Sequence, residues 1–430
     1  MTEPLARLGL LYYPDDLHYT QADLEGWLPV LQSLRARWLV VRGSVRRGIP
    51  EPFLRGLLEA GLEPIVHLPG RARPSDLSGL QMLLRSYANW GVRYVAVGDR
   101  VNMRSTWDSV DWAHGHLPDR FLDAWLPVLH AQRSAGLTPM LPPLEPGGDY
   151  WDLAFLGGVL HALMRRGEQA LLEQMAFGAY AWTHAHPLDW GLGGPARWPE
   201  ARPYQTPEGT QDHRGLRLPE WYRAVIENET GLRRPILVLG GGVWPAESAG
   251  PLDPDPAHSR TLAVLRLLLD PAFCPGLIAF GFHLLAADAD SPDAGRAWFA
   301  GPESPSATAA AVLRAVALAE QAASAAPAKP IQHYLLLSST PGASLDPSWS
   351  HVADFIARHR PAVGFSPEEA SHAARVTLAA QDDSACLALE DQLRAAGCVV
   401  ERLPVSVLSP AQAAGAVPVD DPARAPAEVE

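Results

Sequence analysis

Short apolar runs alternate with longer segments of helical periodicity through the first three quarters of the chain. The apolar runs have the length expected of strands buried on both faces. They predict eight strands: Leu8–Tyr13, Trp38–Val41, Pro64–Leu68, Tyr94–Val97, Thr138–Leu144, Phe177–Trp182, Pro235–Leu239 and Leu277–Phe282. Apolar residues at three- and four-residue spacing between them predict helices. These helices are Ala22–Arg35, Pro52–Ala60, a helix from an N-cap at Ser75 to Trp90, Phe121–Ser134, Trp151–Arg165, Pro219–Glu229, Ser259–Leu268 and Ala307–Ala323.

Eight successive β/α repeats between Leu8 and Ala323 predict an α/β fold, a (β/α)₈ TIM barrel. A doubly wound open sheet is the alternative. The barrel is favoured because no glycine-rich phosphate-binding motif follows the first strand.

The remainder of the chain predicts a second, smaller domain. We expect the barrel to occupy residues 1–325, a linker 326–330, and a small C-terminal α/β domain 331–410 with strand–helix–strand order. Residues 411–430 are rich in Ala, Pro and acidic residues and are expected to be disordered. We interpret the small domain as a packing or assembly module.

Charge and cysteine content exclude several classes of protein. With 35 basic and 48 acidic residues the formal net charge is −13, which argues against nucleic acid or an anionic membrane as partner. No apolar run reaches the roughly 18 residues of a membrane span. The three cysteines fit neither a disulfide framework nor a metal site. The first residues lack the pattern of a signal peptide, so we expect a cytoplasmic protein, with a processed secreted form as the alternative.

The carboxyl ends of the predicted strands carry the candidate chemistry. In a barrel these ends form the functional face, and here they are rich in Arg, His and Trp. Indole rings stack on the apolar faces of sugars, while Arg, His and Asn bind the hydroxyl groups. We therefore predict a carbohydrate ligand and no cofactor. The predicted ligand-binding residues are Arg42, His67, Asn102, Trp182, His184, His186, Trp244 and His283.

The pair His184 and His186 also suggests a metal site, because residues i and i+2 of a strand share a face. Against this, Pro187 follows at once, and no third ligand stands at a suitable spacing. We therefore favour hydrogen-bonding or packed histidines and predict no metal.

The order of elements resembles the glycoside hydrolase barrels that carry the acid/base at the end of strand four and the nucleophile at the end of strand seven. The segment YVAVGDRVN places Arg100 where that family has its first glutamate, and PILVLGGGVWP places Gly240 where it has the second. Arg42 and the segment HAHPLDW also resemble the family, and the resemblance covers Leu8 to Ala323. It implies a degenerate member lacking both catalytic glutamates.

Retaining hydrolysis needs two carboxyl groups about 5–5.5 Å apart, and neither Arg100 nor Gly240 supplies one. We therefore predict a non-hydrolytic, glycoside-hydrolase-like protein with a carbohydrate-binding or structural role. One alternative is an active glycoside hydrolase or related carbohydrate-active enzyme that uses relocated carboxylates, with Asp99 and Glu145 as candidates. A second alternative is a structural assembly subunit.

Overall fold

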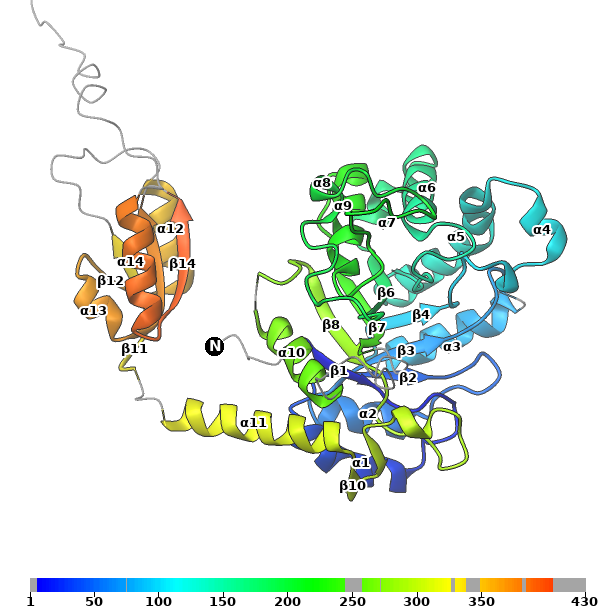
Figure 1. The fold of residues 1–430 in the computed structure, drawn as a ribbon, viewed down its shortest axis with the longest axis horizontal. Coiled ribbons are helices and arrows are strands. Elements are labelled where there is room, and N and C mark those ends of the chain that lie inside the picture. Colours follow the sequence, from blue (N-terminus) through cyan, green and yellow to red (C-terminus); the bar gives the residue numbers. More distant parts are fainter. Residues whose placement is uncertain are drawn as a thin grey trace, which may run out of the picture. The chain divides into compact units, whose positions relative to one another are not determined.

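The computed structural model describes residues 6–74, 76–243, 257–270, 272–325, 329–337, 349–380 and 384–404. The chain divides into two compact units, Met1–Glu320 and Gln321–Glu430 (Figure 1). The predicted disordered tail and most of the predicted linker lie outside the described residues. In the described ranges, no helix has the length and apolar content needed to cross a bilayer.

Eight parallel strands form the wall of the first unit. They are β1 (Leu8–Leu11), β2 (Trp38–Arg42), β3 (Glu63–Leu68), β4 (Tyr94–Val97), β5 (Met140–Leu141), β6 (Ala176–Trp182), β7 (Ile236–Gly242) and β8 (Leu277–Phe282). Their order is β4-β3-β2-β1-β8-β7-β6-β5. A parallel bridge between Tyr94 and Thr138 joins β4 to the segment that leads into β5, so the sheet closes on itself. The predicted (β/α)₈ barrel is confirmed, and the open sheet is wrong.

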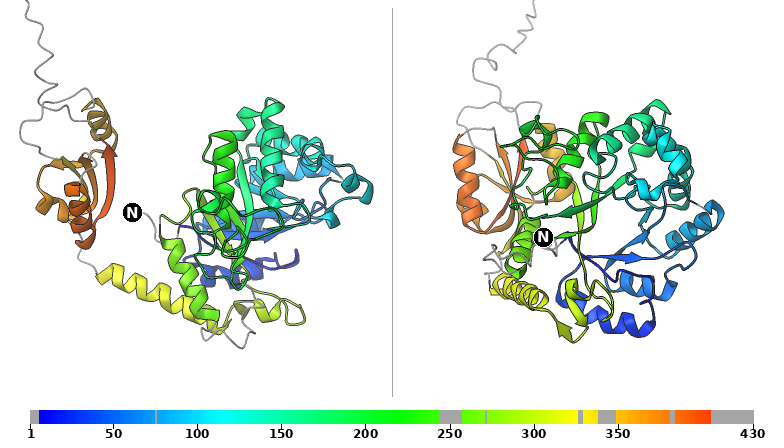
Figure 2. Two further views of the ribbon diagram at one scale, coloured as in Figure 1. Left: turned by 45° about the horizontal axis from the view of Figure 1, so that its top comes forward. Right: turned by 45° about the vertical axis from the view of Figure 1, so that its right-hand side comes forward.

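Helices surround this wall (Figure 2). The longer ones are α1 (Gln21–Ser33), α2 (Glu51–Glu59), α3 (Leu77–Asn89), α5 (Leu117–Ala135), α6 (Asp152–Arg165), α9 (Leu218–Thr230), α10 (Ala257–Leu269) and α11 (Ala307–Ala325). Each contributes apolar side chains to the core of the barrel unit; in α1 they are Leu24, Trp27 and Leu31. The short helices α4 (Ser109–Ala113), α7 (Gln169–Leu172) and α8 (Gly194–Arg197), and the hairpin of β9 (Phe299–Gly301) and β10 (Ser304–Pro305), were not predicted.

A separate cluster of apolar side chains fills the barrel interior, including Trp38 and Val40 of β2 and Ile65 of β3. Successive side chains of a strand point to opposite faces of the sheet. Arg42 comes two residues after Val40, and His67 two residues after Ile65, so both also face the barrel interior. The two residues are also paired across the β2–β3 ladder. This alternation places them at the carboxyl end of the interior.

Several predicted boundaries differ from the structure. β5 has only two residues, because Pro142 and Pro143 follow and have no backbone N–H for the ladder. β7 extends to Gly242, so Gly240 lies within the strand rather than beyond its end. The N-cap of α3 is Asp76, whose carboxylate accepts from Gly79 N at 2.9 Å. The predicted cap, Ser75, lies outside the described residues.

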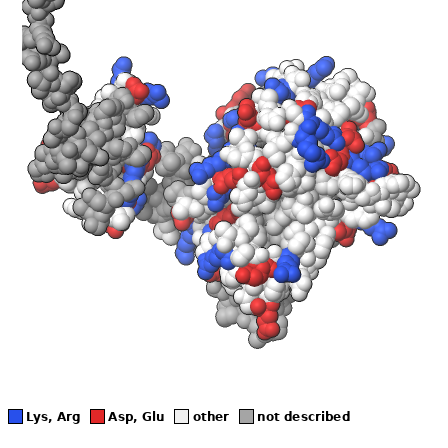
Figure 3. Space-filling view, turned by 90° about the horizontal axis from the view of Figure 1, so that it is seen from above, with Lys and Arg blue, Asp and Glu red and all other residues white. Residues whose placement is uncertain are grey.

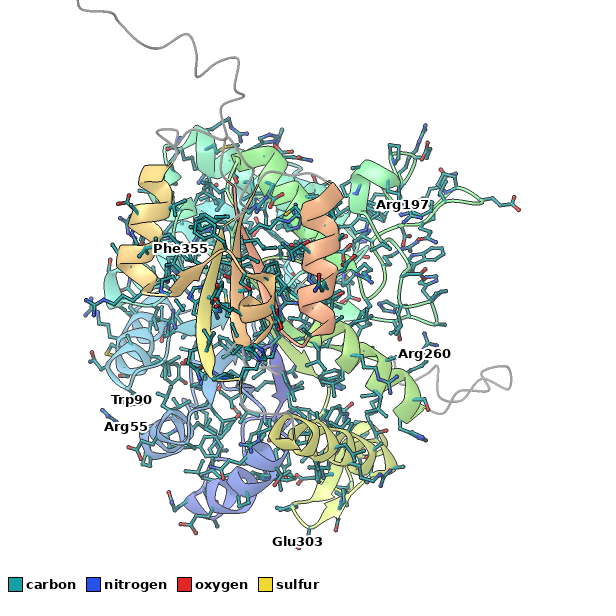
Figure 4. The ribbon with its side chains drawn as sticks, turned by 90° about the vertical axis from the view of Figure 1, so that its left-hand side faces the viewer. Arg55, Trp90, Arg197, Arg260, Glu303 and Phe355 are labelled. Carbon is teal, nitrogen blue, oxygen red and sulfur yellow. The ribbon has the colours of Figure 1, made fainter. Side chains whose placement is uncertain are left out.

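The second unit has a four-stranded parallel sheet of order β12-β11-β13-β14, which confirms a small α/β domain. Its elements are β11 (Ile331–Leu337), α12 (Trp349–His359), β12 (Ala362–Gly364), α13 (Pro367–Ser371), β13 (Ala373–Ala380), α14 (Ser384–Ala395) and β14 (Val399–Pro404). Phe355 of α12, labelled in Figure 4, packs against a cluster that includes Leu335 and Leu337.

The only lysine of the chain, Lys329, precedes β11. Its ammonium group donates to the carbonyl oxygens of Ser371 at 2.9 Å and Ala396 at 2.7 Å, and it lies 2.9 Å from Cys398 Sγ. The two carbonyls stand at the carboxyl ends of α13 and α14, where a cation is favoured by the helix dipole. Lys329 therefore ties the start of β11 to both helix ends.

Candidate functional site

Eight side chains define a cluster at the carboxyl end of the barrel, which we call the mouth cluster. Its members are Arg42, His67, Asp99, Arg100, Glu145, Tyr180, Trp182 and His283. All lie in the last residues of a strand or in the loop that follows it, so the parallel barrel brings together positions far apart in sequence. On the face of the barrel unit seen in Figure 3, basic and acidic side chains lie interspersed.

Asp99 and Glu145, the two candidate carboxylates, lie on either side of one guanidinium group. Arg100 NH1 is 3.7 Å from Asp99 Oδ2, and Arg100 Nε is 2.6 Å from Glu145 Oε2. The second contact is an ion pair whose angle falls outside hydrogen-bond geometry. The backbone of Arg100 has a left-handed φ of +47° and donates to Pro143 O at 2.9 Å, which fixes the residue between the two acids.

Tyr180 contacts both Asp99 and Arg100, and it was not among the residues predicted from the sequence. Its hydroxyl donates to Asp99 Oδ1 at 2.8 Å, and the Arg100 guanidinium lies over its ring at 4.7 Å from the centroid. Burial, reinforced by Asp99, raises the pKa of Tyr180 far above its usual value, so the phenol keeps its proton. Tyr180 stands two residues before Trp182 in β6, and strand alternation could have identified it.

The Tyr180 ring also explains the glycine at position 240. A Cβ on Gly240 would lie 3.3 Å from two ring carbons of Tyr180 and 3.5 Å from Trp182 Cζ2. A glutamate there would have to displace the tyrosine. Tyr180, which is bonded to Asp99, therefore occupies the space beside Gly240.

Asn102 holds Glu145 in place through the backbone. Its side-chain amide donates to Glu145 O at 2.8 Å and to Tyr150 O at 2.9 Å, and its oxygen accepts from Glu145 N at 2.8 Å. Asn102 is fully buried, and both amide hydrogens are used by these bonds. The structure thus gives this predicted ligand residue a positioning role.

The charge state of Glu145 reflects two opposing effects. Burial raises its pKa, and Arg100 lowers it by a smaller amount, so the net shift is upward.

Two histidines of the mouth cluster are neutral near pH 7. Burial lowers the pKa of His67 to about 4, and Nε2 of this residue lies 3.1 Å from Gly98 O. Burial likewise lowers the pKa of His283 to about 4, and its ring packs edge-on against Trp182 with centroids 5.3 Å apart. The formal charges of the cluster therefore come from two arginines and two carboxylates.

His184 and His186 lie in a turn rather than on a strand. β6 ends at Trp182, and His184 and Ala185 have left-handed φ values of +46° and +62°. The His186 ring stacks on Trp190 at 4.1 Å, and its carbonyl accepts from Arg260 of α10 at 2.7 Å (Figure 4 labels Arg260). The shared strand face on which the metal hypothesis depended is therefore not formed. The remaining predicted ligand residue, Trp244, lies outside the described residues.

A cavity of about 360 Å³ lies between α8 and α9, lined by residues that include Gly193, Glu220 and Arg223. None of the predicted ligand-binding residues lines it.

No family model matches the chain, and no curated protein matches it in sequence. Solved structures similar to it include a family 39 glycoside hydrolase from Bacteroides cellulosilyticus WH2, with 12% identity and a TM-score of 0.46 over 74% of this chain and 65% of that one. A family 39 enzyme from Xanthomonas axonopodis pv. citri matches with 12% identity and a TM-score of 0.46 over 73% and 66%. A family 128 endo-β-1,3-glucanase from Sorangium cellulosum matches with 14% identity and a TM-score of 0.43 over 71% and 97%.

The chain thus spans slightly less than two thirds of the two family 39 proteins. At this identity the similarity concerns the barrel fold and not the activity. In its fold, this chain is similar to glycoside hydrolase (β/α)₈ barrels.

Proposed function

We propose that the first unit is a non-hydrolytic, glycoside-hydrolase-like barrel that binds carbohydrate at the mouth cluster. One observation carries the proposal: Asp99 and Glu145 are both ion-paired with Arg100. A retaining glycosidase needs one carboxylate free to attack and one carboxylic acid free to donate a proton. A shared guanidinium opposes both roles, because the cation engages both carboxyl groups and leaves neither of them free.

The same residues suit recognition of a polyhydroxy ligand. The side chains of Arg100 and Glu145 remain 41% and 35% exposed, so a guanidinium donor and a carboxylate acceptor are both accessible. Sugar hydroxyls accept from the first and donate to the second. Two cations and two anions balance one another, which favours a neutral sugar over a phosphorylated one.

The test is a glycan array followed by calorimetric titration of the best ligand, with hydrolysis of the same glycan followed by mass spectrometry. We expect binding without cleavage products. Glu145→Gln and Arg42→Ala should weaken binding about tenfold, equivalent to roughly 1.4 kcal/mol. Arg133→Ala, which removes an exposed charge from the last turn of α5, is the matched control and should bind normally. Unchanged binding by both mouth variants would reject the proposed site.

The alternative, a hydrolase with relocated carboxylates, is favoured by a different observation. The pKa of Glu145 is raised, as a general acid requires, and Asp99 lies on the opposite side of the same arginine. Turnover of any bound glycan that is abolished by both Glu145→Gln and Asp99→Asn would establish this alternative and reject the non-hydrolytic proposal.

A further inference from the structure

Outside the mouth cluster, the loops after β1 and β8 bring Asp15, His18 and Asp288 together. One ligand atom from each of the three lies within 4.8 Å of the others. His18 Nε2 is 3.6 Å from Asp15 Oδ2 and 3.4 Å from Asp288 Oδ2. β1 and β8 are adjacent in the barrel wall, so both loops emerge at the same rim.

These distances exceed those of direct hydrogen bonds. An N–H···O bond has its heavy atoms about 2.7–3.2 Å apart. His18 Nε2 is buried, and it has no hydrogen-bond partner within the described residues. A buried ring nitrogen that approaches two carboxylates without bonding to either leaves room for an atom between them.

The two distances from His18 instead match the spacing of ligands around a tetrahedral ion. With metal–ligand bonds of about 2.0–2.2 Å, two ligand atoms of a tetrahedral zinc site are about 3.3–3.6 Å apart. The values of 3.4 and 3.6 Å fall within this range.

Neighbouring groups hold two of the three side chains in position without using the atoms that face the ion. The His18 ring stacks on Tyr13 with centroids 3.7 Å apart and an interplanar angle of 18°. The second oxygen of Asp15, Oδ1, accepts from Leu17 N at 2.9 Å, which leaves Oδ2 directed at His18. Support of this kind from surrounding groups is typical of metal ligands.

We propose that Asp15, His18 and Asp288 bind a divalent transition-metal ion of the zinc type. The imidazole selects against Ca²⁺ and Mg²⁺, which take oxygen ligands, whereas one nitrogen with two carboxylates suits Zn²⁺ or Co²⁺. Three protein ligands leave a fourth position of the tetrahedron for water or a ligand group. The Asp288 side chain is 50% exposed, so this position is accessible from solvent.

The test uses the full chain after treatment with a chelator. Calorimetric titration with Zn²⁺ should show a single site, and Co²⁺ should give the intense visible absorption of a four-coordinate complex. Asp15→Asn, His18→Gln and Asp288→Asn should each weaken Zn²⁺ binding by about tenfold or more. Asp290→Asn removes the same charge two residues from Asp288, from an exposed position outside the trio, and should leave binding unchanged.

The proposal fails if the chain does not bind Zn²⁺, or if His18→Gln and Asp288→Asn bind it as tightly as the parent. It also fails if binding is lost only in His184→Ala and His186→Ala, because the ion would then lie elsewhere on the rim. Asp288 is half exposed, so Asp288→Asn is expected to fold even if His18→Gln does not. Glycan binding is measured separately, so either proposal can fail without the other.

Discussion

At the scale of single residues, the hydrogen bond between Tyr180 and Asp99 joins β6 to the loop after β4 within the mouth cluster. The bond is 2.8 Å long and joins a fully enclosed phenol to a carboxylate whose nearest cation is 3.7 Å away. Tyr180→Phe should lower the free energy of unfolding by about 1–3 kcal/mol, because the partly buried carboxylate of Asp99 loses its closest donor. Urea denaturation at pH 7 measures this loss.

Tyr94→Phe is the matched control for this experiment. Tyr94 also lies in the barrel interior, with 5% of its surface exposed, and its hydroxyl makes no hydrogen bond to the described residues. Equal losses in the two variants would show that the Tyr180–Asp99 bond adds nothing measurable to the free energy of unfolding.

Part of the site could be predicted from the sequence, because strand ends and alternation are visible there. These signals found Arg42, His67, Trp182 and His283, together with both carboxylates. They did not show that the side-chain amide of Asn102 is hydrogen-bonded to backbone carbonyl groups, because those partners lie 43 and 48 residues away in sequence. The turn at His184 was also hidden, because a left-handed φ at a non-glycine residue has no reliable sequence signal.

At the scale of elements, β7 continues for three residues beyond the end predicted from its apolar run. The predicted strand ended at Leu239, before three consecutive glycines, but the ladder with β6 continues to the pair Trp182 and Gly242. Pairing with a neighbour set this boundary, and the local sequence carries no information about the neighbour. β5 ended early for the opposite reason, which was visible locally as two prolines.

The glycines of β7 are not equivalent. A Cβ on Gly241 would lie 2.5 Å from Ala181 O and 2.8 Å from Phe280 Cζ, whereas a Cβ on Gly240 meets only ring atoms at 3.3 Å or more. Gly241→Ala should cost about 3 kcal/mol or prevent folding, and Gly240→Ala about 1 kcal/mol. Chemical denaturation compares them, with Gly295→Ala as the control at an open position. A larger loss for Gly240→Ala would contradict this account of the packing.

At the scale of the whole molecule, buried histidines make stability depend on pH. The pKa of His67 is about 4 in the folded chain and about 6.5 in an unfolded one. Between these values the unfolded state binds more protons, so the free energy of unfolding falls as the pH is lowered from 6.5 toward 4. The full effect for His67 is about 3 kcal/mol, and His283 acts in the same direction.

Urea denaturation at pH 7 and pH 5 measures this dependence. His67→Asn should reduce the difference between the two pH values, whereas His114→Gln, at an exposed position, should not. An unchanged difference in His67→Asn would mean that other groups cause the acid sensitivity.

We also expect residues 1–325 to fold without the second unit. Ala309, Val312 and Val316 of α11 belong to the core of the barrel unit, so the fragment should retain this helix. Circular dichroism should show a cooperative thermal transition near the barrel transition of the full chain. An aggregated or molten fragment would contradict this expectation.

The position of Lys329 makes the second unit open to a simple chemical measurement. The chain has one side-chain amine, and in the folded state it is held by two carbonyl groups and a thiol. An acylating reagent can modify this amine only after those contacts break. The rate at which one acyl group appears at Lys329 in the intact protein therefore reports how often this corner of the second unit opens, without any introduced label.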